Sequence, residues 1–237
     1  MLYVIYRISD NGYPKEKFSF ATKTYCLRNF MNAFQEANVH VLLDDTNLKE
    51  STKADVMELV DKNECSLKVY TGGSSAASWR YGLEYAMQLP DLKDDDYLYF
   101  VEDDYLHKEG SEAVLLEGLE RAHYVSLYDH LDKYIPAMLG GNKYIDRDGA
   151  EITKVTLTKS SHWKLTNSTT MTFATMVSTI KADKPVWDRW TMGSYPHDFN
   201  IFIELREQGR TLITPIPSWS THCLLEWVAP LIDWSQV

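Results

Sequence analysis

Cysteine is scarce in this 237-residue chain, and its few copies lie far apart. Cys26, Cys65 and Cys223 are an odd set without a CxxC pair, so they define neither a disulfide framework nor a zinc site. No charged segment followed by an apolar stretch stands at the N-terminus, and no apolar run is long enough to cross a membrane. We therefore expect a cytoplasmic protein without a membrane span.

Positive charge is also in short supply. Lys and Arg together number 24 against 34 Asp and Glu, which gives a formal net charge of -10. Nucleic acids and anionic membranes recruit proteins through an excess of Lys and Arg, so neither is an expected partner. An anionic ligand would need a metal ion or a local basic pocket.

The glycine motifs of the common nucleotide folds are missing. Neither GxGxxG nor GxxxxGK[ST] occurs, which disfavours a dinucleotide site and a P-loop. We interpret Gly72-Gly73 primarily as a turn, and only secondarily as a loop that could bind phosphate. Repeats, low-complexity tracts and linkers are absent too, so we expect a single domain over residues 1–237. The end after Val237 leaves room for further domains in a longer protein.

What the sequence does contain is a regular alternation of strands and helices. Strands are predicted over Leu2–Ile8, Val39–Leu43 and Leu67–Tyr70, and helices over Thr24–Ala37, Ser51–Lys62 and the segment from Trp79 to Met87. Such alternation predicts an α/β fold with a mainly parallel central sheet and helices on both faces.

The second half is less regular. We predict a helix over Ser111–Ala122 capped by Ser111, strands over Tyr124–Tyr128, Thr170–Thr179 and Leu212–Ile213, a hairpin turn at Asp148-Gly149, and a helix opened by Pro196-His197-Asp198.

A buried strand runs directly into three acids in the segment Tyr97 to Tyr105, YLYFVEDDY. Ligands of open α/β sheets gather at the carboxyl ends of strands. Glu102, Asp103 and Asp104 would repel one another there unless a cation or donors from the chain kept them ionised. Hard divalent cations prefer oxygen ligands, so we predict a metal site with phosphate nearby. The plainer alternative is a strand end followed by solvated acids.

The order of elements and the acidic triplet together resemble the nucleotide-diphospho-sugar transferase fold, called GT-A. Glu102-Asp103-Asp104 is similar to the EDD form of its DxD signature. No QxxRW motif follows Asp198, so the chain looks more like the non-processive, inverting members of glycosyltransferase family 2 than the polysaccharide synthases. The resemblance implies a donor lobe over residues 1–105 and an acceptor lobe over 106–237.

The resemblance also implies roles for single residues of the donor lobe. Asp104 would ligate the metal ion, while Glu102 and Asp103 would approach the ribose or the donor sugar. The other donor-binding positions are Arg7, Asp44, Asp45 and Arg80. The two aspartates would hold the nucleobase or its ribose, and the two arginines would reach the donor. Turn caps and ordinary ion pairs remain the structural alternatives.

Two residues of the second half complete the expected site. His222 would be a late metal ligand and Asp198 the catalytic base. The alternative for His222 is a buried histidine with hydrogen-bond partners in the core, and the alternative for Asp198 is a purely structural helix cap. Because an imidazole joins the ligands, Mn²⁺ is favoured over Mg²⁺.

The implied activity is metal-dependent transfer of a sugar, with inversion, from a UDP-, GDP- or dTDP-sugar to a hydroxyl of a glycan or other acceptor. One alternative is a sugar-phosphate nucleotidylyltransferase, which the loop SDNGYPKEKFSF matches poorly. A non-catalytic domain that binds carbohydrate or nucleotide sugar is another. A metal-dependent phosphohydrolase is disfavoured, because no DxDx[TV] nucleophile follows the first strand.

Overall fold

The computed structural model describes residues 1–10 and 16–237, and within them a nine-stranded mixed sheet runs through the molecule. Its strands are β1 (Leu2–Ile8), β2 (Asn38–Asp44), β3 (Ser66–Tyr70), β4 (Tyr97–Glu102), β6 (Tyr124–Val125), β7 (Val155–Leu157), β8 (His162–Leu165), β9 (Phe173–Met176) and β10 (Leu212–Ile216). They are ordered β3-β2-β1-β4-β9-β6-β10-β8-β7. The first four strands are parallel, as their alternation with helices predicts.

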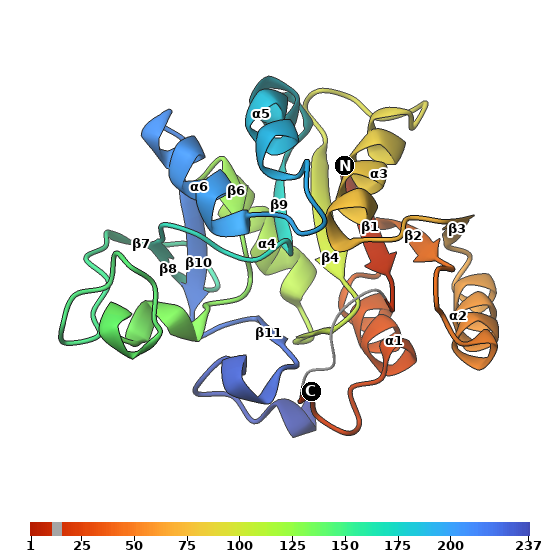
Figure 1. Ribbon diagram of the computed structural model, residues 1–237, viewed down its shortest axis with the longest axis horizontal. Coiled ribbons are helices and arrows are strands. Elements are labelled where there is room, and N and C mark those ends of the chain that lie inside the picture. Colours follow the sequence, from red (N-terminus) through yellow and green to blue (C-terminus); the bar gives the residue numbers. More distant parts are fainter. Residues whose placement is uncertain (11–15) are drawn as a thin grey trace.

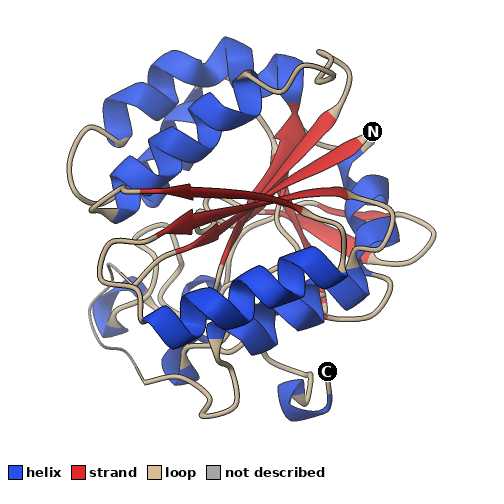
Figure 2. Cartoon of the chain, turned by 90° about the vertical axis from the view of Figure 1, so that its right-hand side faces the viewer, coloured by secondary structure: helices blue, strands red, loops and turns tan. Residues whose placement is uncertain are grey.

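Helices cover both faces of this sheet, which Figure 2 shows edge-on between two helical layers. They are α1 (Lys23–Ala33), α2 (Glu50–Lys62), α3 (Ser75–Met87), α4 (Ser111–Leu119), α5 (Val177–Trp190) and α6 (Asp198–Glu207). Side chains of α1, α2 and α4 build one apolar core, and those of α3, α5 and α6 build the other. The predicted α/β class is therefore confirmed, and the predicted strand Leu2–Ile8 matches β1 residue for residue.

A small second sheet lies beside the carboxyl end of β4. It pairs β5 (Tyr105–His107) with β11 (Ser220–His222) in antiparallel register, and His222 stands opposite Tyr105. The chain after β11 then packs with the start of α1 in a third apolar core around Cys26, Cys223 and Trp234. Figure 1 shows β11 and the C-terminus at the same end of the molecule as α1. Residues far apart in sequence therefore meet here.

The strand order also joins the two halves of the chain, because β4 pairs with β9 in one continuous sheet. None of the helices in the described part of the chain is both long and apolar enough to span a bilayer. Residues 11–15 of the loop after β1 lie outside the described residues, so the structure does not test the reading of that segment.

Three expectations for the second half were wrong. The cap of α4 is Gly110, in a left-handed conformation with φ 82°, and Ser111 is the first residue inside the helix. Asp148-Gly149 forms a turn without flanking strands; the hairpin β7–β8 closes instead at Thr158, whose N–H donates to Ser161 O. A glycine-free turn of this kind leaves no strong sequence signal.

The third error concerns Thr170–Thr179, which was predicted as one strand. The strand ends at Met176, and α5 begins at Val177. β-branched residues favoured the strand, and Pro185 concealed the helix. The apolar side of α5, including Ile180 and Trp187, packs on the sheet and overrides those local preferences.

Gly118 lies where α4 packs closely against the sheet. A Cβ at this position would lie 2.7 Å from Trp163 Cη2 and 2.9 Å from Val125 Cγ1. We expect Gly118→Ala to lower the free energy of unfolding by about 1–3 kcal/mol through overpacking, measured by urea unfolding. Gly193→Ala is the matched control, since the nearest atom to its Cβ is 4.0 Å away. Equal stability of the two variants would contradict the close packing.

Candidate functional site

The carboxyl ends of β1 and β4 bring the acidic triplet into a charged edge of the sheet. Arg7 is paired in register with Glu102, the last residue of β4. Asp103 and Asp104 then form the turn into β5. This edge is where open α/β sheets bind ligands.

Each acid of the triplet faces a cation of the chain itself. Glu102 Oε1 lies 3.7 Å from Arg7 Nη2. Asp103 Oδ2 accepts from Lys23 Nζ at 2.7 Å, and Asp104 Oδ2 accepts from Lys17 Nζ at 2.7 Å. Each of the three adjacent acids thus has a basic side chain of the chain beside it. The sequence analysis left open whether a metal ion or basic groups of the chain would offset the repulsion between the acids, and such basic groups are present.

Asp104 has a second partner in His222. Its Oδ2 lies 3.1 Å from His222 Nε2, because the β5–β11 register places His222 opposite the residue that follows Asp104. The His222 ring stacks on Tyr105, with centroids 4.9 Å apart and planes 4° from parallel. Burial opposes the charge of Asp104, but attraction to His222 and Lys17 outweighs it and holds the pKa of Asp104 well below its usual range.

The Asp104–His222 pair fits a divalent cation shared with a ligand. The pair offers a carboxylate oxygen and an imidazole nitrogen side by side, both of which are donor types that a divalent transition-metal cation takes. In the described ranges 1–10 and 16–237, no three His, Cys, Asp or Glu side chains converge on one point that could hold a metal. Ions such as Mg²⁺ take one or two protein ligands and complete their shell with phosphate oxygens and water. The donor set therefore suits an ion held between protein and phosphate.

Asp103 fastens the loop that follows β1. Its Oδ2 accepts from the backbone N–H of Ser9 at 2.8 Å as well as from Lys23, whose Nζ also donates to Ser9 O at 2.7 Å. Burial works against the charge of Lys23, yet Asp103 and Asp10 raise the pKa of its ammonium. Lys23, at the start of α1, thus connects Ser9, directly after β1, to the triplet.

Arg7 is the side chain at this edge that most needs a partner. It is 5% exposed, and its Nε and Nη2 have no hydrogen-bond partner among the described residues. Its stem lies against α3 where Gly82 leaves room, since a Cβ there would stand 3.2 Å from Arg7 Cδ. The guanidinium also lies 5.6 Å from the centroid of the Trp79 ring. A buried cation with open donors suits an anionic ligand.

Asp44 and Asp45 organise the loop before α3. Asp44 is fully buried and accepts from the N–H groups of Thr46, Gly72 and Gly73 at 3.0, 3.0 and 3.3 Å. Gly72 permits this, because a Cβ there would lie 2.6 Å from Asp44 Oδ2. Asp45 accepts from Thr71 Oγ1 at 3.0 Å. Both carboxylates therefore have structural partners at the ends of β2 and β3.

Arg80 lies on α3 and its guanidinium contacts the end of α5. Its Nη1 donates to the backbone carbonyl of Thr191, the residue that caps the C-terminal end of α5. The structure therefore gives Arg80 a role in joining α3 to α5.

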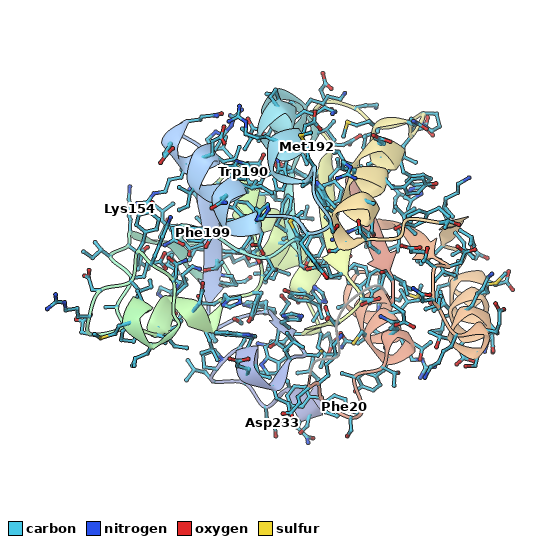
Figure 3. The ribbon with its side chains drawn as sticks, viewed as in Figure 1. Phe20, Lys154, Trp190, Met192, Phe199 and Asp233 are labelled. Carbon is cyan, nitrogen blue, oxygen red and sulfur yellow. The ribbon has the colours of Figure 1, made fainter. Side chains whose placement is uncertain are left out.

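Asp198 begins α6 and is half-buried; Figure 3 labels its neighbour Phe199. Burial raises the pKa of Asp198, and the nearby charges of His130 and Lys133 partly offset this. Burial likewise raises the pKa of Glu102, and Asp198 is one of the negative charges that contribute. The two carboxyl groups thus share one electrostatic environment, which the sequence could not show.

Sequence reasoning missed several charged residues of this region. Lys17 and Lys23 contact the triplet directly. On the other side, His130, Asp132 and Lys133 form a cluster in which Asp132 Oδ1 lies 2.7 Å from Lys133 Nζ. The available signal was a group of three lysines, Lys15, Lys17 and Lys23, after the first strand in a chain with few cations.

Comparison with known proteins supports the fold. No family model matches the chain, and no curated protein matches it in sequence. A crystal structure of GalNAc-T7 with UDP, GalNAc and Mn²⁺ is similar over 93% of this chain, with a TM-score of 0.61 and 14% identity. The likeness covers 42% of GalNAc-T7, so this chain spans less than half of that protein.

A second similar structure is the 4-diphosphocytidyl-2C-methyl-D-erythritol synthase of Anaerococcus prevotii. It matches over 90% of this chain and 87% of its own, with a TM-score of 0.52 and 10% identity. At such identities a likeness defines the fold alone. The chain therefore has the α/β fold of the GT-A type, with a large central sheet and flanking helices.

The lowered pKa of Asp104 carries a stability prediction. Its folded pKa lies below the unfolded value of about 3.9, so the ionised group stabilises the fold above about pH 4 and loses this contribution as the pH falls. We expect the unfolding free energy of the metal-free protein to drop more steeply below about pH 4 than that of Asp104→Asn. Urea unfolding across this range measures it, and parallel pH curves would contradict the ion pairing.

Proposed function

We propose that this protein is a metal-dependent glycosyltransferase that moves a sugar from a nucleotide-diphospho-sugar to a hydroxyl of a glycan or other acceptor, with inversion. The observation that carries the proposal is the Asp104–His222 pair, 3.1 Å apart at the carboxyl ends of the parallel strands β1 and β4. The buried guanidinium of Arg7 on the same edge supports an anionic donor. The GT-A fold is consistent with both.

Asp104 and His222 would hold Mn²⁺ or Mg²⁺, which supplies charge to neutralise the leaving diphosphate. Arg7 would donate its open N–H groups to phosphate oxygens. Glu102 would approach the ribose or donor sugar. Asp103 would do so through Oδ1, since its hydrogen bonds to Ser9 and Lys23 both use Oδ2. These residues bind and orient the donor.

The remaining donor assignments lie further along the edge. Asp44 and Asp45, with the Gly72 loop that they organise, would border the nucleobase. Arg80 would reach the nucleotide only by leaving the Thr191 carbonyl. Residues 1–105 would thus form the donor lobe and residues 106–237 the acceptor lobe of one domain.

Asp198 is the proposed base. It would take the proton of the acceptor hydroxyl while that oxygen attacks the anomeric carbon opposite the leaving diphosphate, which inverts the configuration. A raised pKa suits this role, because a base works best when its pKa approaches the working pH. Phe199, next to Asp198, stacks on Tyr144 with ring centroids 6.0 Å apart and could support a sugar face.

Nucleotide binding tests the metal site. Calorimetric titration with UDP, GDP and dTDP, each with and without Mn²⁺, should reveal manganese-dependent binding of one nucleotide. Asp104→Ala should abolish that dependence, because it removes a ligand. Asp198→Asn is the matched control and should bind normally. If no nucleotide binds under any condition, the proposal is wrong and a carbohydrate-binding role becomes the better reading.

Turnover tests the base. Asp198→Asn should lower the transfer rate by about 10²–10⁴-fold, measured as release of nucleoside diphosphate from the sugar nucleotide that binds, with a sugar acceptor. Normal turnover in Asp198→Asn would refute the assignment. Use of a nucleoside triphosphate and a sugar phosphate, with release of inorganic diphosphate, would instead identify a nucleotidylyltransferase.

The pH profile gives an independent check. Asp198 acts as a base only when ionised, and its pKa is raised by burial, so activity should fall on the acid side at a pH above the ordinary aspartate value of about 3.9. The profile of kcat should lose this acid limb in Asp198→Asn, whose residual rate is independent of that titration. Persistence of the limb would assign it to another group.

A further inference from the structure

Lys17 occupies the oxygen that the proposed metal ion needs. Lys17 Nζ lies 2.7 Å from Asp104 Oδ2, the same atom that lies 3.1 Å from His222 Nε2. A carboxylate oxygen bound to an ammonium and close to an imidazole has little charge left for a divalent cation. The ammonium and the cation therefore compete for one position.

The backbone holds Lys17 in this place. The isolated bridge between Lys17 and Leu224 is antiparallel, the N–H of Phe18 donates to Cys223 O at 3.2 Å, and the N–H of Leu225 donates to Glu16 O at 3.0 Å. The segment that carries Lys17 is thus joined to the segment that follows His222. Because both backbones are fixed together, the contact with Asp104 is a built feature of the fold.

Lys23 shows that the arrangement is specific. It sits on the neighbouring acid, Asp103, and also bonds Ser9 O, so it fastens a loop. Lys17 has Asp104 as its hydrogen-bonding side-chain partner among the described residues and lies at the metal end of the triplet. Only its side chain needs to move for the oxygen to become free.

We propose that the Lys17 ammonium is an internal placeholder for the divalent cation: it neutralises Asp104 in the donor-free protein and yields its position when the cation arrives with the donor diphosphate. This inference rests on the proposed function. The diphosphate gives the displaced ammonium a new anionic partner, whereas the metal alone offers none. The free protein should therefore bind metal weakly, and metal and nucleotide should strengthen each other's binding by the same factor.

The test is direct titration with Mn²⁺ in the absence of nucleotide, followed by the electron spin resonance signal of free Mn²⁺. Lys17→Met should bind Mn²⁺ on the order of ten- to a hundred-fold more tightly than the natural protein, the equivalent of one charge-assisted hydrogen bond. The factor by which UDP, GDP or dTDP strengthens Mn²⁺ binding should shrink accordingly. Lys17→Gln is measured in parallel, so that the result does not depend on one variant folding well.

Two controls separate this effect from a general loss of positive charge. Lys62→Met removes the same charge from an exposed pair with Glu58 and should leave Mn²⁺ affinity unchanged. Adding Asp104→Asn to Lys17→Met should return Mn²⁺ binding to the weak natural level. Unchanged affinity in both Lys17 variants, or an equal gain in Lys62→Met, would overturn the proposal.

The outcomes also distinguish this inference from the proposed function. Manganese-dependent nucleotide binding together with unchanged metal affinity in the Lys17 variants would retain the transferase and reject the placeholder. Tighter Mn²⁺ binding in those variants without binding of any nucleotide would place a cation site at Asp104 and reject the transferase.

Discussion

The structure depends on accommodating three adjacent acidic side chains at the carboxyl edge of the sheet. Side chains at a half-buried strand end lose much of their hydration, so like charges there are costly unless cations stand nearby. The chain supplies Arg7, Lys23 and Lys17, one for each acid. In a protein with a net charge of -10, three of the few basic side chains are thus concentrated at one site. It holds Ser9, directly after β1, and Lys17 beside the triplet.

The site is assembled from distant parts of the chain by backbone pairing. The end of β4 and the turn into β5 carry the acids, while β11 and the segment around Lys17 pair beside them. The Arg7–Glu102 and Asp104–His222 contacts therefore follow from strand registers. This explains why His222 can serve beside Asp104 although 118 positions separate them in sequence, and why the third apolar core, around Cys26 and Trp234, underlies the same region.

The sequence predicted the regular part of the fold well and the irregular part poorly. A continuous apolar run such as Leu2–Ile8 predicts a buried strand, and apolar residues at helical spacing predict an amphipathic helix. The helix α5 could not be predicted in this way. Its β-branched residues and Pro185 locally disfavour a helix, and only packing against the sheet overrides that preference. At the site, the acidic triplet could be recognised in the sequence, because three acids directly follow a buried strand. His222 was proposed only through the family resemblance, and the metal roles of Asp104 and His222 stay predictions. The lysine partners of the acids could not be predicted, because a lysine in a loop carries no pattern that says where its side chain lies.

The opposite edge of the sheet has its own charged contact. The terminal ammonium of Met1 lies 2.7 Å from Asp96 Oδ1, at the amino ends of β1 and β4, whereas Tyr25 of α1 donates to the backbone of Val237 at the other end of the molecule. An affinity handle attached ahead of Met1 would exchange one exposed terminal charge for a peptide bond, far from the triplet. The same handle attached after Val237 would emerge beside α1 and the segments that carry Lys17 and His222. Purified material for studying the acidic triplet is therefore better prepared with its handle at the amino terminus.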